Sequence, residues 1–128
     1  MEKENSKKSD ETKKKILVVE KNPVRRGDLI ALLTINNYLP HGVDGLGSAV
    51  EIIKEWIPDL AIIDLHSKNR LEGVRLVEYF KSKRCLRKIP IIILMGEARY
   101  YFKKKYPIIY RPLKDKEVLE NARKLLKE

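Results

Sequence analysis

Three short aliphatic runs constrain the fold of this chain most strongly. They occupy residues 16–19, 60–65 and 91–95; the first two are bounded by polar or charged residues, and the third by proline and glycine. Apolar and polar residues do not alternate along most of their length, which is typical of parallel strands covered on both faces. Parallel strands require crossover connections of helical length. The sequence therefore predicts an α/β protein with helices on both faces of a buried parallel sheet.

Helical patterns separate these runs. Apolar residues recur at spacings of three and four over 23–35, 48–57, 73–83 and 115–126. Ser48 and Glu51 have the spacing of a capping box at the start of the second pattern, and Asp115 fits the N-cap of the last. Residues 38–47 are typical of a short edge strand with loops. We expect one domain over 15–128, preceded by a flexible charged tail over 1–14.

Composition excludes several classes of protein. The longest apolar runs have about five residues, far below the roughly 20 that a membrane-spanning helix needs. No apolar segment follows the N-terminal lysines, so a secretory signal is not indicated, and the lone Cys85 cannot form an internal disulfide. We therefore expect a soluble cytoplasmic protein with no membrane contact.

Chemistry is expected at one edge of the predicted sheet. In open α/β sheets, ligands bind outside the carboxyl ends of the strands. The residues predicted at those ends are Glu20 and Lys21 after the first strand, Asp64 in the third, Met95 in the fourth and Arg111 after the fifth.

These residues and the segments around them resemble the receiver domains of response regulators in two-component signalling. The matching segments are ILVVE at 16–20, PDLAIIDL at 58–65, IPIIIL at 89–94 and RPL at 111–113, with Pro23, Arg26, Leu29 and Gly73 between them. The resemblance implies the flavodoxin-like receiver fold, a doubly wound five-stranded parallel sheet. No single motif carries it; the ordered set does.

The resemblance also implies a function. Asp64 would accept a phosphoryl group from a histidine kinase or phosphotransfer protein, and the domain would signal through protein contacts. That role is a regulatory phosphoacceptor rather than an enzyme. Mg²⁺ would be held by Glu20, Asp64 and the backbone carbonyl of His66. Since phosphoryl transfer depends on positioning and on cations, these residue types suit the chemistry.

Two departures concern the metal. Lys21 stands where receivers usually carry a second acid, the direct metal ligand, so we expect Mg²⁺ binding to be weak or absent. The lysine could instead supply the positive charge itself, or it could be an exposed loop residue. Gly73 also lies one residue further along than the family pattern expects, which changes the loop after Asp64.

Other departures concern the response to phosphate. Met95 replaces the usual Ser or Thr, and a thioether cannot donate a hydrogen bond. Arg111 replaces the usual lysine but can still bind phosphate or pair with Asp64. Ile108 stands where receivers carry a switching aromatic residue. The chain between Met95 and Arg111 is about six residues shorter than usual, close to two helical turns, so we expect a shortened fourth helix.

Two functions therefore stay open at this point. One is a receiver that still takes phosphate on Asp64. The other is a pseudo-receiver, a docking module that never turns over phosphate. Because the chain ends soon after its last helix, we expect a stand-alone domain that acts through a partner.

Basic charge is concentrated in one segment. The formal net charge is +10, and residues 81–116 contain twelve Lys or Arg against two acids, which accounts for all of it. The resemblance places this segment on the face of the fourth helix, fifth strand and fifth helix, which receivers use for partners or for a homodimer. We expect an acidic protein partner there, with Lys103, Lys104 and Lys105 as its densest contact. Nucleic acid is less favoured, because no DNA-reading motif is present.

Overall fold

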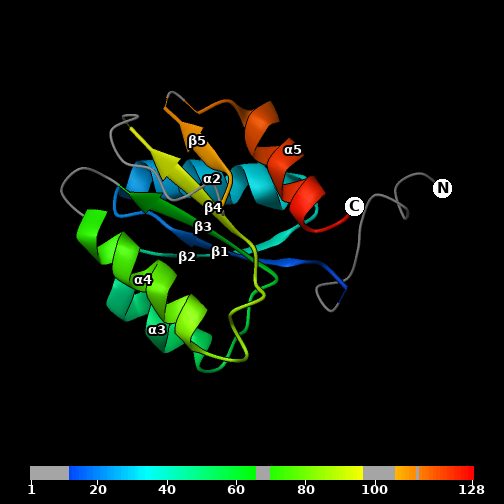
Figure 1. Cartoon of the computed structure of the whole chain (residues 1–128). Coiled ribbons are helices and arrows are strands. Elements are labelled where there is room, and N and C mark those ends of the chain that lie inside the picture. The colour runs from blue at the N-terminus through cyan, green and yellow to red at the C-terminus, as the bar shows by residue number, and fades with distance from the viewer. Residues whose placement is uncertain (1–11, 66–69, 97–105, 112) are drawn as a thin grey trace.

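Five parallel strands form one sheet in the computed structural model of the chain, in the order β2-β1-β3-β4-β5 (Figure 1). The structure describes residues 12–65, 70–96, 106–111 and 113–128. Its elements in chain order are β1 (Lys15–Val19), α2 (Pro23–Ile35), β2 (Leu39–Val43), α3 (Leu46–Ile53), β3 (Leu60–Leu65), α4 (Arg70–Ser82), β4 (Ile91–Met95), β5 (Ile108–Tyr110) and α5 (Asp115–Leu125). The doubly wound five-stranded sheet is thus confirmed.

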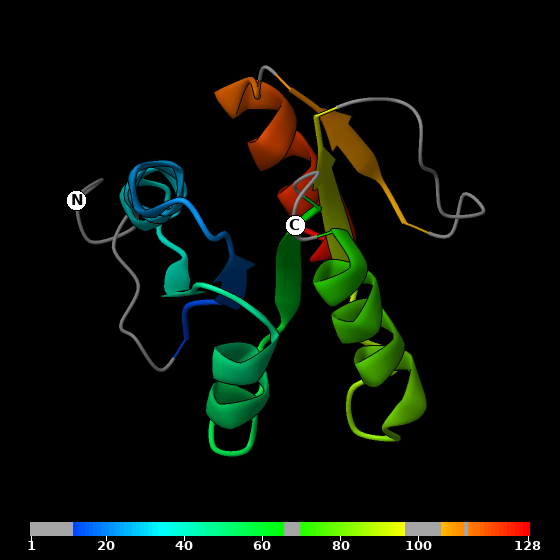
Figure 2. The same cartoon turned by 90° about the vertical axis from the view of Figure 1, so that its left-hand side faces the viewer.

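Helices cover both faces of this sheet. Helices α3 and α4 lie side by side on one face, and α2 and α5 cover the other (Figures 1 and 2). Because successive strand residues point to opposite faces, the aliphatic runs divide between two cores. Leu17, Ile63 and Ile93 belong to the core under α3 and α4, whereas Val18 and Ile62 belong to the core under α2 and α5. This double burial explains why the three runs lack alternation.

The helix starts differ from those that the sequence predicts. The capping box of Ser48 with Glu51 is wrong: α3 begins at Leu46, and the Ser48 hydroxyl donates to Asp44 Oδ1 at 2.9 Å. Asp115 is the first residue of α5 rather than its N-cap. These capping residues were predicted from local spacing alone, whereas tertiary contacts decide where each helix begins.

Two expectations concern segments that lie wholly or mostly outside the described residues. The shortened fourth helix that the sequence predicts between β4 and β5 is not the helix labelled α4. It would fall within 97–105, outside the described residues. Most of the predicted tail also lies outside them, but Lys14 is described, and its carbonyl accepts a hydrogen bond from the Leu39 amide at 2.9 Å. The ladder between β1 and β2 therefore begins one residue inside the predicted tail. Among the described residues, no helix is long and apolar enough to cross a membrane.

Candidate functional site

Three charged residues from three separate strands meet at the carboxyl edge of the sheet. Asp64 lies near the end of β3, Glu20 directly follows β1, and Arg111 directly follows β5. Each stands two positions after a residue buried under α2 and α5, namely Val18, Ile62 or Ile109. Since side chains alternate along a strand, the three charged groups lie toward that same face. The regular extension of the strands is what brings them together.

Arg111 holds both acids. Its Nη2 atom donates to Oδ1 of Asp64 and lies 3.2 Å from Oε1 of Glu20. The same Glu20 oxygen lies 3.5 Å from Nε of Arg25, and Oε2 accepts from the Asn22 amide at 3.1 Å. The carboxylate side chains of Glu20 and Asp64 are 1% and 2% exposed, against 20% for Arg111. A buried carboxylate pair is thus neutralised by guanidinium groups that reach it from the side of solvent.

The environment of Asp64 favours its protonated form. Burial and, to a smaller extent, the neighbouring Glu20 carboxylate together raise the pKa of Asp64 to about 6, against the opposing effect of Arg111. Burial penalises the charged carboxylate, and two carboxylates close together repel each other. Arg111 therefore offsets only part of the cost of placing two acids in one buried site.

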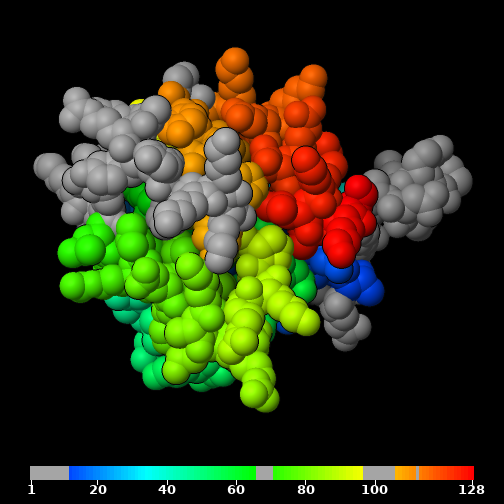
Figure 3. All heavy atoms as spheres, in the orientation of Figure 1, coloured from blue at the N-terminus to red at the C-terminus, as the bar shows by residue number. Residues whose placement is uncertain are grey.

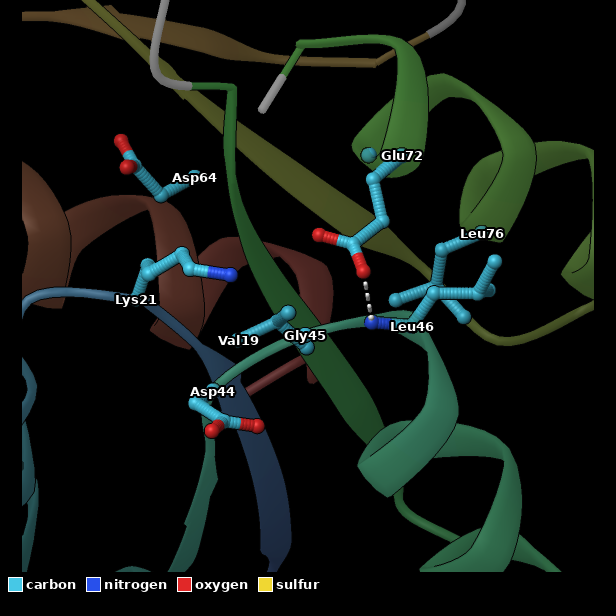
Figure 4. A pocket seen from close by; sticks show the side chains of 9 residues that line it. Val19, Lys21, Asp44, Gly45, Leu46, Asp64, Glu72 and Leu76 are labelled. Atoms are coloured by element: carbon cyan, nitrogen blue, oxygen red, sulfur yellow. Dashed lines mark hydrogen bonds between the residues drawn. The ribbon is translucent and has the colours of Figure 1, made fainter. Parts of the chain in front are cut away.

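A second group of charges lines a pocket on the opposite side of Asp64. Figure 4 shows Lys21 extending into this pocket, with Asp44 at the end of β2 and Glu72 on α4 around it. Lys21 is exposed, and no ion pair joins its ammonium group to Asp64. Arg111 contacts Asp64 from the α2 and α5 side, and Lys21 lies beside it on the α3 and α4 side, where Figure 4 shows the Asp64 carboxylate turned away from the lysine ammonium group.

Glu72 fastens α4 to the start of α3. Its Oε2 atom accepts a hydrogen bond from the Leu46 amide at 3.2 Å, at the first residue of α3. The N-cap of that helix is Gly45, which has no side chain to serve this amide. A Cβ added to Gly45 would lie 3.0 Å from Glu72 Oε2. An acid from a neighbouring helix therefore supplies a cap for α3, and glycine leaves room for it.

Gly73 allows α4 to approach the strand that carries Asp64. A Cβ added there would lie 2.0 Å from Cδ2 of Leu65 and 3.6 Å from the backbone oxygen of Asp64. Leu65 is buried under the same helix. Although Gly73 is displaced by one residue from the family pattern, it still permits close contact beside Asp64.

The donor set does not fit Mg²⁺. Glu20 already uses both carboxylate oxygens for hydrogen bonds, Oδ1 of Asp64 is bonded to Arg111, and Lys21 brings a positive charge where a second acid would bind. His66, whose carbonyl was expected to be a ligand, lies outside the described residues. Within 12–65, 70–96, 106–111 and 113–128, no group of three His, Cys, Asp or Glu could hold a metal. Cations of the protein itself occupy the surroundings of Asp64.

The remaining site residues lie as follows. Met95 ends β4 with 2% exposure and packs in the core under α3 and α4. Its carbonyl accepts from the amide of Arg111 at 2.8 Å, which ties the start of the β5–α5 connection to β4. Ile108 begins β5 and packs partly buried against the same core as Met95.

Sequence reasoning missed Asp44, Glu72 and Arg25. Asp44 follows the short edge strand, so its place at the carboxyl edge could have been read from the strand order. Glu72 precedes Gly73 in a segment where the predicted helix began too late, three residues after the observed start. Arg25 could not have been found, because its contact with Glu20 depends on where α2 packs.

The basic segment does not form one face. Residues 81–88 follow α4 and precede β4, so they lie at the amino edge of the sheet, away from Asp64. The expected partner surface at Lys103, Lys104 and Lys105 falls outside the described residues. Placing the whole of 81–116 on the face of the fourth helix, fifth strand and fifth helix was therefore wrong for its first part. Sequence proximity was taken for spatial proximity across a buried strand.

Comparison with solved structures identifies the fold. The structure is similar to a signal receiver domain of a histidine kinase from Syntrophus aciditrophicus, with a TM-score of 0.75 and 24% identity over 89% of this chain and 90% of that one. It is also similar to a response regulator receiver protein from Sinorhizobium medicae (TM-score 0.78, 17% identity, 91% and 96% covered). A signal receiver domain of an HD domain-containing protein from Pseudomonas fluorescens gives a TM-score of 0.78 at 21% identity, over 90% and 95%.

No protein-family model matches the sequence, and no curated protein matches it either. The chain therefore has the receiver fold, at 17–24% identity to these three solved structures.

Proposed function

We propose that this chain is a receiver-type signalling domain that accepts a phosphoryl group on Asp64 and signals through protein contacts. The observation that supports it is the convergence of Asp64, Glu20 and Arg111 from β3, β1 and β5 at one edge of a receiver fold. The donor would be the phosphohistidine of a histidine kinase or phosphotransfer protein.

The reaction needs a free carboxylate oxygen and nearby positive charge. An oxygen of Asp64 attacks phosphorus, an acyl phosphate bond forms, the bond between phosphorus and the histidine nitrogen breaks, and the imidazole leaves with its electron pair and takes up a proton. Arg111 bonds Oδ1, so Oδ2 is the candidate nucleophile. Guanidinium groups bind phosphoryl oxygens well, so Arg111 can exchange its carboxylate partner for the transferred group.

Lys21 supplies the second cation in this proposal. It extends into the pocket beside Asp64 where receivers usually place an acid and a metal ion (Figure 4). An ammonium group at 4 Å from a phosphoryl oxygen would contribute on the order of 4 kcal/mol at an effective dielectric of 20. The domain would then depend less on Mg²⁺ than other receivers do.

Intact-mass measurement after incubation with a small phosphodonor, such as acetyl phosphate, tests the proposal. We expect a one-phosphoryl adduct in the wild type, with and without Mg²⁺, and none in Asp64→Asn. Lys21→Ala should reduce the metal-free adduct, whereas Lys114→Ala, an exposed lysine before α5, should not. An unmodified wild type at high donor and metal concentrations would exclude the phosphoacceptor function.

A pseudo-receiver that only docks partners is the second candidate function. Arg111 already satisfies both buried acids without any phosphoryl group, and the Met95 side chain cannot donate a hydrogen bond to one. Partner binding that is identical for wild type and Asp64→Asn would favour this candidate, whereas binding that changes after phosphodonor treatment would favour the first.

A further inference from the structure

Ten Lys and Arg side chains from three distant segments gather at the amino edge of the sheet, opposite Asp64. The segments are 14–15, 81–88 and 123–127, and they contain no acid. The first precedes β1, the second connects α4 to β4, and the third ends α5. We call these ten side chains the basic end face. Only the second segment belongs to the charge cluster that is visible in the sequence.

Hydrogen bonds of residues in and beside the three segments place them along one edge of the sheet. The amide of Asp59 donates to the carbonyl of Lys15 at 2.8 Å, and that of Ala61 donates to Pro90 at 3.0 Å, so β3 links the first segment to the second. The Tyr38 hydroxyl donates to Glu128 at 2.8 Å, which holds the C-terminal segment beside the start of β2. Figure 3 shows the red C-terminal residues next to the blue residues that begin the described chain, with yellow-green residues on the same side of the molecule.

The nearby acids Asp59 and Glu128 offset only part of this charge. The Asp59 carboxylate accepts a hydrogen bond from the Lys15 amide at 2.7 Å, and Glu128 is held by Tyr38. Cations near helix C-termini are favourable, but this effect falls off within the last turn. The last turn of α4 and the connection after it hold five, all exposed: Lys81, Lys83, Arg84, Arg87 and Lys88. The charge therefore exceeds what the helix ends require.

The chemistry of the face favours a nucleic acid over an acidic protein. Protein interfaces have apolar and aromatic centres and are depleted in lysine, whereas nucleic-acid interfaces are polar and strongly positive. Among the described residues, none of the large exposed apolar side chains belongs to the three segments of this face, and Ile35 at the end of α2 and Ile57 in the connection before β3 are the two that lie at the same edge. The four adjacent strands β2, β1, β3 and β4 lie about 4.8 Å apart and together span roughly 14 Å. This span is comparable to the width of the major groove of DNA, about 12 Å.

We propose that the basic end face binds the phosphate backbone of a nucleic acid without reading its sequence. Because the face lies at the opposite edge of the sheet from Asp64, it would be available while a partner occupies the phosphoacceptor site. The proposal does not depend on phosphorylation, and Asp64→Asn should bind nucleic acid as the wild type does.

Fluorescence anisotropy of a labelled DNA duplex, titrated with the full chain at several salt concentrations, tests this proposal. Arg84→Glu/Arg87→Glu should weaken binding about ten-fold or more and lower the slope of log affinity against log salt by about 2. Lys124→Glu/Lys127→Glu should do the same, although these residues lie about 40 positions away in the sequence. Lys114→Glu/Lys116→Glu changes the net charge equally at the other edge and should have a smaller effect. Circular dichroism confirms that each variant is folded.

Three outcomes would overturn the proposal. If all three double variants lose affinity equally, total charge rather than a face attracts the duplex. If only the 84/87 pair has an effect, the segments do not act together. If the wild type binds an acidic polypeptide such as polyglutamate, or anionic vesicles, but neither DNA nor RNA, the face serves another partner.

Discussion

Arg111 and Asp64 are joined by a hydrogen bond from Nη2 to Oδ1, although 47 residues separate them in the chain and β4 lies between their strands. The same nitrogen lies 3.2 Å from Glu20. Arg111 therefore places one positive charge beside buried acids from two strands on the far side of β4. Any group that approaches Asp64 must either displace Arg111 from the carboxylate or bind to Arg111 as well.

The stability of the protein should depend on the ionisation of Asp64. Its pKa is raised to about 6, from an ordinary value of 3.8, by burial and by Glu20. The folded state then binds a proton more tightly than the unfolded chain, so the free energy of unfolding falls as pH rises from about 4 through about 6. Two pKa units correspond to about 3 kcal/mol as an upper value.

Urea denaturation of wild type and Asp64→Asn between pH 4 and pH 8 checks this dependence. The stability of the wild type relative to the variant should fall across that window, because the variant lacks the titrating group. A constant difference would show that the pKa of Asp64 is the same in the folded and the unfolded state. Carbon-13 NMR titration of the carboxyl group measures the pKa directly.

Removal of Arg111 should destabilise the fold at neutral pH. Arg111→Ala leaves two carboxylates with 1% and 2% exposure without their shared partner, at a cost of about 3 kcal/mol. Arg111→Lys should cost less, because it keeps the charge but not the fork geometry. In an Asp64→Asn background, Arg111→Ala should cost less than half as much. Chemical denaturation measures both costs. Equal costs in the two backgrounds would mean that the ion pair between Arg111 and Asp64 contributes nothing to the free energy of unfolding.

Replacement of Lys21 by Asp should create a metal site. The pocket already holds Asp44, Asp64 and Glu72 near this position (Figure 4), and carboxylate oxygens are the ligands that Mg²⁺ prefers. Lys21→Asp should bind Mg²⁺ at least ten-fold more tightly than wild type by calorimetry, a difference of about 1.4 kcal/mol. Lys21→Ala removes the positive charge without adding a ligand. Its Mg²⁺ affinity should therefore lie between those of the wild type and Lys21→Asp. Identical affinities in all three proteins would make Lys21 a bystander.

Gly73 and Gly47 form a matched pair for testing the contact between α4 and β3. A Cβ at Gly73 would lie 2.0 Å from Leu65, whereas one at Gly47 in α3 would meet nothing within 4 Å. Gly73→Ala should destabilise the protein by about 1–3 kcal/mol through overpacking. Gly47→Ala should stabilise it by about 0.5–1 kcal/mol through helix propensity. Thermal unfolding compares them, and a neutral Gly73→Ala would show that Leu65 moves aside without cost.

The sequence by itself determined the sheet and the principal residues of its carboxyl edge. Fully buried parallel strands leave aliphatic runs without alternation, and their ends point to Glu20, Lys21, Asp64, Met95 and Arg111. These predictions depend on local pattern and on the rule that parallel strands end at one edge. The bond between Arg111 and Asp64 was one of two roles foreseen for that arginine.

Only the tertiary structure decided which charges surround Asp64 and which gather at the opposite edge. Glu72 enters the pocket because α4 packs beside α3, and Arg25 reaches Glu20 because α2 lies over β1. The basic end face exists because β3 brings the start of β1 near the start of β4, while Tyr38 holds the C-terminal segment. Side chains that meet through packing of separate elements leave no periodic pattern in the sequence, so their contacts could not be predicted from it.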